Sequence, residues 1–242
     1  MGIDVLDRQS PKLVTHNPNH EKRVVTAVAS NPTRSTVGDV PIVSVFRRTR
    51  TGDADRDGNP LIYALKGIKG YSILPYWRAE IMGLAGEILA GILDELAEFD
   101  HVLAVPSSNA FCSDVAAFVS QASGVPVLAS TFIQKKTVGQ MLAGFGGIPA
   151  DVRKQDRQEF GAQLNRWSKL RPGSAVSMKD IARSIRPHFD PFTATAEAPD
   201  LIGRNVLIVD DLLSSGASIS SVAGILRERG AMVSALCFLS GI

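Results

Sequence analysis

Hydrophobic residues return at helical spacing in one long stretch of the chain. Over residues 76–99, apolar side chains recur every three or four positions, which places them on one face of a helix. They are Ile81, Leu84, Ile88, Ile92 and Leu96. The pattern therefore predicts one long amphipathic helix from about Tyr76 to Phe99.

Shorter apolar runs alternate with helical segments in two other parts of the chain. The predicted order is strand 102–105, helix 114–123 and strand 125–129, then strand 205–209, helix 217–229 and strand 232–239. Pro106 bounds the first of these strands, and Gly230 ends the last helix. A strand, a helix and a second strand in this order form a βαβ unit with parallel strands. We therefore expect an α/β fold with a parallel, twisted sheet flanked by helices.

The first part of the chain follows a different pattern. Apolar runs at 23–29 and 40–46 predict two strands, and the short run 61–65 predicts a third. We expect residues 1–60 to form an N-terminal β-rich lobe or hood. This lobe would be added to a core at residues 61–242.

Residues 131–200 interrupt this core and are rich in glycine, proline and charged residues. They predict a mobile insertion, with a helix inside 151–171. Residues 131–190 hold 11 Lys+Arg and 5 Asp+Glu, a local charge of +6. Residues 61–130 hold 3 and 7, a local charge of −4. A chain of almost neutral charge therefore carries a basic insertion beside an acidic early core.

The overall composition excludes several classes of protein. The chain has 242 residues, of which 45% are hydrophobic, so disorder over its whole length is excluded. Its two cysteines, Cys112 and Cys237, are too few for a disulfide scaffold or a four-cysteine zinc site. A net charge of +2 and 6% aromatic residues do not favour broad nucleic-acid binding. No apolar run is long enough to span a membrane and no signal-peptide pattern is present, so we expect a cytoplasmic protein.

One segment carries the clearest candidate chemistry. The apolar strand 206–209 ends in two adjacent carboxylates, Asp210 and Asp211, and a loop of small residues then leads into a helix. Ligands of open α/β sheets bind at the carboxyl ends of the strands, and a helix N-terminus offers unpaired N–H groups to a phosphate. The carboxylates suit the hydroxyls of a ribose, or Mg²⁺ bound through water. A buried strand followed by an acidic helix cap is the alternative.

This segment, Val206–Ser218, resembles the phosphoribosyl pyrophosphate (PRPP) signature of the type I phosphoribosyltransferases. That signature has four apolar residues, two acidic residues and a Thr/Ser-Gly-Gly/Ala-Thr/Ser loop. The resemblance implies the type I phosphoribosyltransferase fold, with Asp210 and Asp211 as catalytic residues that hold the ribose 2′ and 3′ hydroxyls. It also implies a 5′-phosphate-binding loop composed of Leu212, Leu213, Ser214, Ser215, Gly216, Ala217 and Ser218.

Two further segments match family features by their position in the chain. The loop after strand 102–105 corresponds to the family's pyrophosphate loop, formed here by Pro106, Ser107, Ser108 and Asn109. An ordinary strand-to-helix turn is the alternative for this loop. The flexible loop that covers PRPP in the family corresponds to the region of Lys135 and Lys136. Solvated basic side chains are the alternative for these two lysines.

A finer resemblance connects the chain to competence protein F (ComF)-like members of the family. Segments 63–66 and 135–140 are similar to two motifs of that group. The Arg-Gly-Phe-Asn-Gln motif of the group is replaced by residues 111–114, and its cysteine zinc ribbon is absent. The sequence therefore resembles a divergent relative over roughly residues 61–242.

A small basic cluster lies outside all of these motifs. Arg47, Arg48 and Arg50 follow the predicted strand 40–46. We take them as a solvated strand edge, with contact to a phosphate or a nucleic acid as the alternative.

The resemblance implies an enzyme that transfers the ribosyl 5-phosphate of PRPP to a nitrogen acceptor and releases pyrophosphate. Mg²⁺ is the implied cofactor, bound through PRPP and not directly by the protein. The expected partners are PRPP and a small-molecule acceptor that the sequence does not identify, with no membrane. Nucleic acid is not favoured, and a homodimer is left open. The alternatives are a non-catalytic regulator that senses PRPP or a nucleotide, and a ComF-like protein of nucleic-acid uptake or defence.

Overall fold

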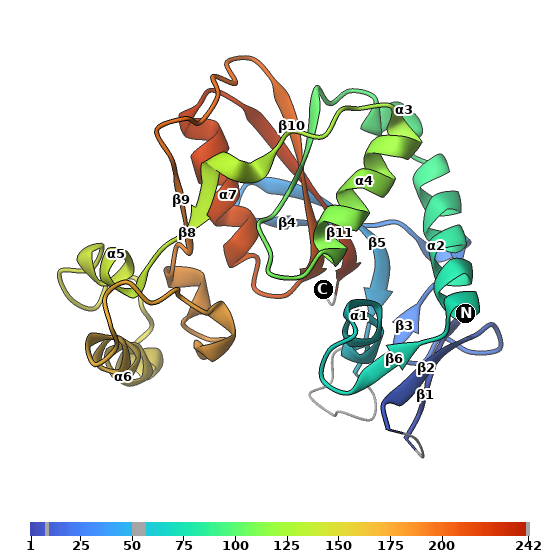
Figure 1. Cartoon of the computed structure of the whole chain (residues 1–242), viewed down its shortest axis with the longest axis horizontal. Helices are drawn as coiled ribbons and strands as arrows, with labels where there is room; N and C mark the ends of the chain where they lie inside the picture. Colours follow the sequence, from blue (N-terminus) through green and yellow to red (C-terminus); the bar gives the residue numbers. More distant parts are fainter. Residues whose placement is uncertain (8–9, 50–56, 241–242) are drawn as a thin grey trace.

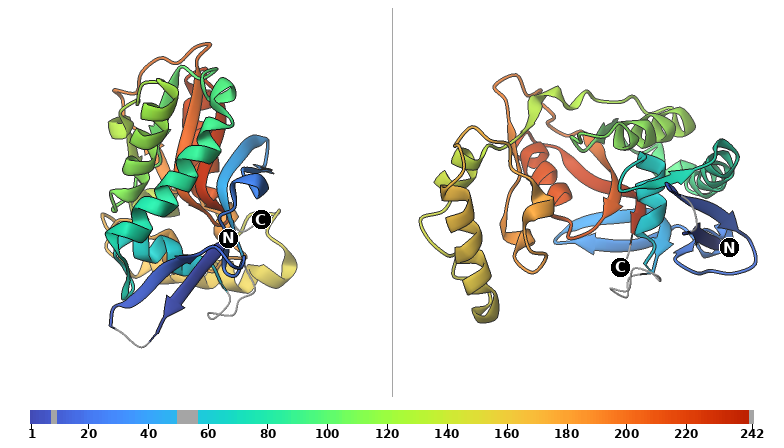
Figure 2. Two further views of the ribbon diagram at one scale, coloured as in Figure 1. Left: turned by 90° about the vertical axis from the view of Figure 1, so that its right-hand side faces the viewer. Right: turned by 60° about the horizontal axis from the view of Figure 1, so that its bottom comes forward.

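Three parts make up the chain in the computed structural model, which describes residues 1–7, 10–49 and 57–240. Figure 1 shows a central sheet with helices packed against it, a small N-terminal sheet and a projecting lobe. The N-terminal sheet and the lobe lie at opposite ends of the molecule (Figure 2). No helix within the described ranges is both long and apolar enough to cross a membrane.

The central sheet has four parallel strands in the order β5, β11, β10 and β7. They are β5 (Val40–Arg48), β11 (Met232–Ser240), β10 (Asn205–Leu213) and β7 (His101–Ala104). Two short strands, β3 (Val24–Val25) and β4 (Thr33–Val37), pair with β5 in the antiparallel direction. Residues 206–209 of β10 are buried, as expected for an inner strand of a parallel sheet. The structure therefore has the mixed α/β class and the mostly parallel sheet that the sequence predicted.

Two helices follow strands of this sheet and pack on it: α4 (Phe111–Ser123) follows the end strand β7, and α7 (Ala217–Glu228) follows β10. α7 connects β10 to β11 and packs on both, whereas α4 packs on β7 and β10. The strand predicted at 125–129 is wrong, because this segment forms only one parallel bridge, between Val127 and Val102. Pro126 has no backbone N–H and cannot extend the ladder.

Two predictions near the start of the core are also corrected. The single helix predicted at 76–99 divides into α2 (Pro75–Ala90) and α3 (Leu93–Leu96), because the backbone leaves the helical region at Ile92. Gly91, a weak helix former, precedes this break. The strand predicted at 61–65 lies instead in a helix, α1 (Asn59–Lys66). Proline near its start and a left-handed Gly67 after its end are both helix-boundary signals.

The first 60 residues contribute to two different sheets. The N-terminal sheet consists of β1 (Gly2–Leu6), β2 (Lys12–Asn17) and β6 (Tyr71–Ile73). The strand predicted at 40–46 is confirmed within β5, which pairs with β11 in the central sheet. The strand predicted at 23–29 is reduced to β3, and a short 3-10 turn over Val28–Ser30 follows. The predicted boundary at residue 60 therefore does not separate one sheet from the other.

Residues 136–191 form the projecting part, which we call the small lobe. Two antiparallel strands, β8 (Ile133–Lys135) and β9 (Phe192–Ala194), join it to the core. The lobe contains α5 (Val138–Ala143) and α6 (Arg157–Ser168), and α6 confirms the helix predicted within 151–171. Its own apolar cluster consists of Val138, Met141, Val152, Phe160, Trp167, Val176, Ile181, Ile185 and Phe189. The predicted insertion is thus a packed unit, and its mobility stays a prediction.

Candidate functional site

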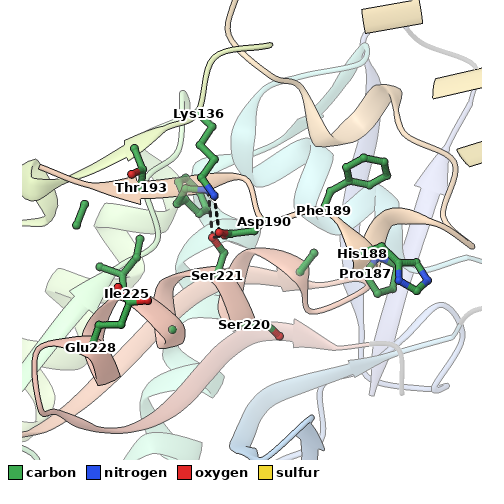
Figure 3. A pocket seen from close by; sticks show the side chains of 14 residues that line it. Lys136, Pro187, His188, Phe189, Asp190, Thr193, Ser220, Ser221, Ile225 and Glu228 are labelled. Atoms are coloured by element: carbon green, nitrogen blue, oxygen red, sulfur yellow. Dashed lines mark hydrogen bonds and ion pairs between the residues drawn. The ribbon is translucent and has the colours of Figure 1, made fainter. Parts of the chain in front are cut away.

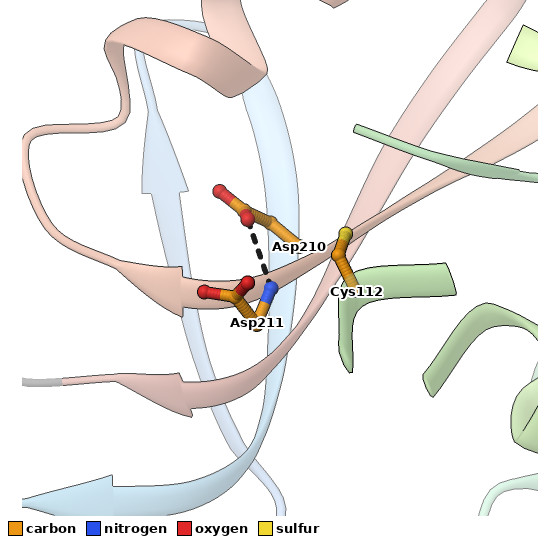
Figure 4. Close-up of side chains that lie close together, drawn as sticks. All are labelled: Cys112, Asp210 and Asp211. Atoms are coloured by element: carbon orange, nitrogen blue, oxygen red, sulfur yellow. Dashed lines mark hydrogen bonds between the residues drawn. The ribbon is translucent and has the colours of Figure 1, made fainter. Parts of the chain in front are cut away.

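Asp210 and Asp211 lie near the carboxyl end of β10. Asp211 is buried, with 5% of its surface exposed, and Asp210 is half-buried. The Asp210 carboxylate accepts a hydrogen bond from the Asp211 backbone N–H at 2.8 Å. Figure 4 shows the pair beside Cys112 of α4, and one ligand atom of each residue lies within 4.8 Å of the others.

Lys66, the last residue of α1, completes this acidic centre. Its Nζ lies 2.6 Å from Oδ2 of Asp211, and both side chains are almost fully buried. A buried ion pair of this kind fixes both groups, since either charge alone would be strongly unfavourable away from water. The sequence had connected Lys66 only to a family motif and not to the carboxylates. The pairing is a contact between distant parts of the chain, which no local pattern marks.

Burial and charge control the protonation of the groups around this centre. Burial, followed by the charge of Asp211, raises the pKa of Asp210 to about 7. The charge of Lys66 acts in the opposite direction. Burial, followed by the charge of Asp210, also raises the pKa of the Cys112 thiol far above its usual range. Cys112 is therefore a protonated packing residue and not a nucleophile.

The donor atoms of this centre suit Mg²⁺ only in part. Carboxylate oxygens are the ligands that Mg²⁺ prefers, and this ion keeps several of its water molecules. A protonated thiol is a poor ligand for it, and Asp211 is already paired with Lys66. The residues therefore fit an ion that reaches the carboxylates through water and is held mainly by a bound substrate.

The phosphate loop predicted at Ser214–Ser218 connects β10 to α7. Gly216 takes a left-handed φ of +78°, which favours glycine, and the helix begins at the next residue. A Cβ atom on Gly216 would lie 2.4 Å from Cγ1 of Val37 in β4. Packing against Val37 therefore requires glycine at position 216, whether or not a ligand binds. The amide groups of the first turn of α7 are available to an anion.

A cavity of about 90 Å³ lies at this loop. Its walls are Asp210, the segment 212–218, and two residues of the small lobe, Met178 and Arg186. The sequence brought Asp210 and the loop together, as the structure does. The sequence did not predict Met178 or Arg186 as residues of the site. The excess of basic residues in the insertion was the one sequence signal for a charged side chain from the lobe.

The loop predicted to bind pyrophosphate, Pro106–Asn109, follows β7 next to the end of β10. Ala104 of β7 pairs with Val209, so this loop starts beside the acidic pair. The Asn109 carboxamide accepts from the Phe111 backbone N–H at 3.0 Å and donates to the Lys66 carbonyl oxygen at 3.2 Å. Ser107 and Ser108 are exposed. The loop is therefore fixed at Asn109 and open at its two serines.

The two predicted flexible-loop lysines lie elsewhere. Lys135 is an exposed residue of β8, and Nζ of Lys136 lies 2.5 Å from Oδ2 of Asp190. Figure 3 shows Lys136, Asp190 and Ser221 in a second cavity of about 430 Å³. This cavity shares only Ala217 with the cavity at the phosphate loop. Lys136 therefore lies beside α7 and does not line the cavity that contains Asp210, and its role in a flexible loop stays a prediction.

Comparison with known proteins gives one distant relative. No model of a known protein family matches the chain. The chain is 23% identical over 156 residues to adenine phosphoribosyltransferase of Mycolicibacterium paratuberculosis, which covers 62% of this chain and 79% of the relative. The chain is distantly similar to a phosphoribosyltransferase. This similarity suggests the family that segment 206–218 resembles, and it gives no support to the finer resemblance to ComF-like proteins.

Proposed function

We propose that this protein is a PRPP-dependent phosphoribosyltransferase, which transfers ribosyl 5-phosphate to a nitrogen acceptor and releases pyrophosphate. One observation carries the proposal: Asp210 and the loop Ser214–Ser218 line a single cavity near the carboxyl end of β10. Ligands of parallel α/β sheets bind at this end of the strands. The similarity to adenine phosphoribosyltransferase supports the same class of reaction.

Each part of the site has a role in this proposal. The carboxylates of Asp210 and Asp211 accept hydrogen bonds from the two ribose hydroxyls. The loop Ser214–Ser218 binds the 5′-phosphate through its amides and serine hydroxyls, with support from the α7 dipole. The loop Pro106–Asn109 binds the pyrophosphate group, since its exposed serines lie beside the acidic centre.

The reaction itself requires no covalent intermediate with the protein. The bond between C1 of the ribose and the pyrophosphate oxygen breaks, and a bond between C1 and the acceptor nitrogen forms. The proton of the acceptor leaves to solvent, and negative charge develops on the pyrophosphate. Catalysis then rests on holding the reactants in line and on stabilising this charge.

Mg²⁺ enters this scheme as part of the substrate complex. When bound to PRPP it stabilises the negative charge of the leaving pyrophosphate. Asp210 and Asp211 would contact it through water, in agreement with the partial fit of their donor atoms.

The test is an assay of pyrophosphate release with PRPP, Mg²⁺ and a panel of nucleobases. Adenine is the first acceptor to try, because the relative is named for it. The variant Asp210→Asn, which leaves the buried Lys66–Asp211 pair intact, should lose PRPP binding, whereas Asp151→Asn, an exposed change in the small lobe, should not. A parent protein that does not bind PRPP would overturn the proposal. Tight PRPP binding with no pyrophosphate release on any acceptor would instead favour the PRPP-sensing regulator.

A further inference from the structure

Arg186 brings a positive charge from the small lobe to the phosphate loop. Arg186 lines the 90 Å³ cavity together with the residues of the loop Ser214–Ser218. Its Nη2 donates to the Ile181 carbonyl oxygen at 2.8 Å, which fixes one edge of the guanidinium. Its Nε is buried and has no hydrogen-bond partner among the described residues. A buried donor without a partner is unfavourable, so the polar groups of Arg186 are not fully satisfied by the described residues.

A second arginine, which is buried, lies at the start of the same loop. Arg48, the last residue of β5, is 6% exposed, and its Nη2 donates to the Leu213 carbonyl oxygen at 3.2 Å. Its Nη1 donates to Asn59, and its Nε is also buried without a partner in the described part of the chain. The sequence had placed Arg48 in a solvated strand edge with a phosphate contact as the alternative, and the observed burial excludes the solvated edge for this residue.

The two arginines create an excess of positive charge at the loop. Burial lowers the pKa of Arg48 and of Arg186, and in both cases the charge of Arg183 is the next cause. The charge of Asp57 partly offsets this effect at Arg48. No ion pair that the described residues form includes Arg48 or Arg186, whereas Lys66 and Lys136 each have a carboxylate partner. The loop therefore lies beside two arginines that form no ion pair among the described residues, and Asp210 is the acidic residue in the wall of the same cavity.

We propose that Arg186 is a further binding residue of the site, which contacts the 5′-phosphate of the ribose ligand across the cavity from the loop Ser214–Ser218. This inference rests on the proposed function, because it assigns a residue to the phosphate of that ligand. A phosphate dianion accepts several hydrogen bonds at once, and a guanidinium supplies charged donors in a plane. The loop amides and Arg186 then hold the phosphate from two sides, so ligand binding also connects the small lobe to the core.

The experiment compares ligands with and without the 5′-phosphate. Isothermal titration calorimetry measures the binding of three ligands, which are ribose 5-phosphate, PRPP and inorganic pyrophosphate. The proteins compared are the parent, Arg186→Gln and Arg186→Lys. Arg171→Gln is the matched control, since it removes an exposed charge from the same lobe, and this residue does not line the cavity. Arg186→Gln should weaken ribose 5-phosphate and PRPP by about 10- to 100-fold, the range of a charged hydrogen bond. Pyrophosphate binding should change by less than about 3-fold, and Arg186→Lys should fall in between.

The outcomes separate this inference from the proposed function. If the parent binds PRPP and Arg186→Gln binds ribose 5-phosphate equally well, the role of Arg186 is overturned while the function stands. An equal loss for pyrophosphate and ribose 5-phosphate, together with a lower melting temperature, would show a purely structural role and also overturn it. A parent that binds neither ribose 5-phosphate nor PRPP would overturn both proposals. A selective loss of the phosphorylated sugars supports the inference, whether or not any acceptor is turned over.

Discussion

Two cavities meet at Ala217, the first residue of α7, and they differ in how their positive charges are balanced. In the larger cavity, Lys136 is paired with Asp190, which also accepts a hydrogen bond from Ser221. In the smaller cavity, Arg186 keeps a buried donor without a partner in the described residues. A charge that is already paired stabilises the protein, whereas an unpaired one is available to a ligand. This difference in charge balance, and not the cavity volume, supports the smaller cavity as the proposed anion site.

The largest expected effect concerns the acidic end of the smaller cavity. Lys66→Met leaves Asp211 buried without its partner, so the free energy of unfolding should fall by about 3–5 kcal/mol at neutral pH. Lys169→Met, a change of an exposed lysine in the small lobe, should stay within about 0.5 kcal/mol of the parent. Urea unfolding measures both variants. The addition of Asp211→Asn should recover part of the loss, and a single variant as stable as the parent would show that the pair is not buried as described.

A pair of glycine substitutions in the loop–α7 segment tests the two cavities directly. Gly216→Ala combines a left-handed φ with a collision with Val37, and should lower the free energy of unfolding by about 2–4 kcal/mol. It should also abolish PRPP binding. Gly224→Ala places a methyl group in open space at the larger cavity, and should stabilise α7 by about 0.5–1 kcal/mol. Thermal unfolding and PRPP titration report both effects, and a loss of PRPP affinity in Gly224→Ala would place the larger cavity in the site.

Asp210 should make the stability of the protein depend on pH. Its pKa is raised from 3.8 to about 7, so the folded protein holds this proton more tightly than the unfolded chain does. The resulting stabilisation is complete below about pH 4 and is lost as the pH rises through 7. Asp210→Asn should therefore flatten the decline in unfolding free energy between these values. At pH 8 the variant should be more stable than the parent by about 1–2 kcal/mol, and an unchanged pH profile would contradict the raised pKa.

The smallest effect is expected in the larger cavity. Asp190→Asn removes a partly exposed ion pair with Lys136, and should lower the free energy of unfolding by about 0.5–1 kcal/mol. PRPP binding should change by less than about 2-fold, since neither residue faces the phosphate loop. Titration of the variant alongside Arg186→Gln measures the difference. Similar losses of PRPP affinity in Asp190→Asn and Arg186→Gln would show that the two cavities do not differ in ligand binding.

The parts of the site that the sequence predicted are those that are local in the chain. Residues 206–218 contain the strand, the carboxylates, the loop and the start of the helix in direct succession. The geometry of this segment is therefore determined by residues that are neighbours in the sequence. Lys66 and Arg186 reach the same place from α1 and from the small lobe. Their positions depend on packing between distant elements, which no periodicity within the sequence records.

The errors in the predicted fold have physical causes of the same kind. The short run 61–65 is apolar throughout, and a run of this length is compatible with either a buried strand or a buried helix. The flanking Pro60 and Gly67 were the signals that decided for a helix. The apolar residues of the run 125–129 predict a strand. A strand also requires backbone N–H groups that can bond to the neighbouring strand, and Pro126 has none.

The pairing of β8 with β9 holds the two ends of the small lobe together, so that the whole lobe is a single insertion into the core. The chain leaves the core at Lys135 and returns at Phe192, and these two residues face each other across the strand pair. Such partners lie about 5 Å apart, a gap that a two-residue hairpin turn closes. The lobe lies between these ends in the chain, so its replacement leaves the order of the central strands intact. A different lobe on the same stalk would change the residues that line the cavity at this loop, Arg186 among them, while the loop Ser214–Ser218 itself is retained.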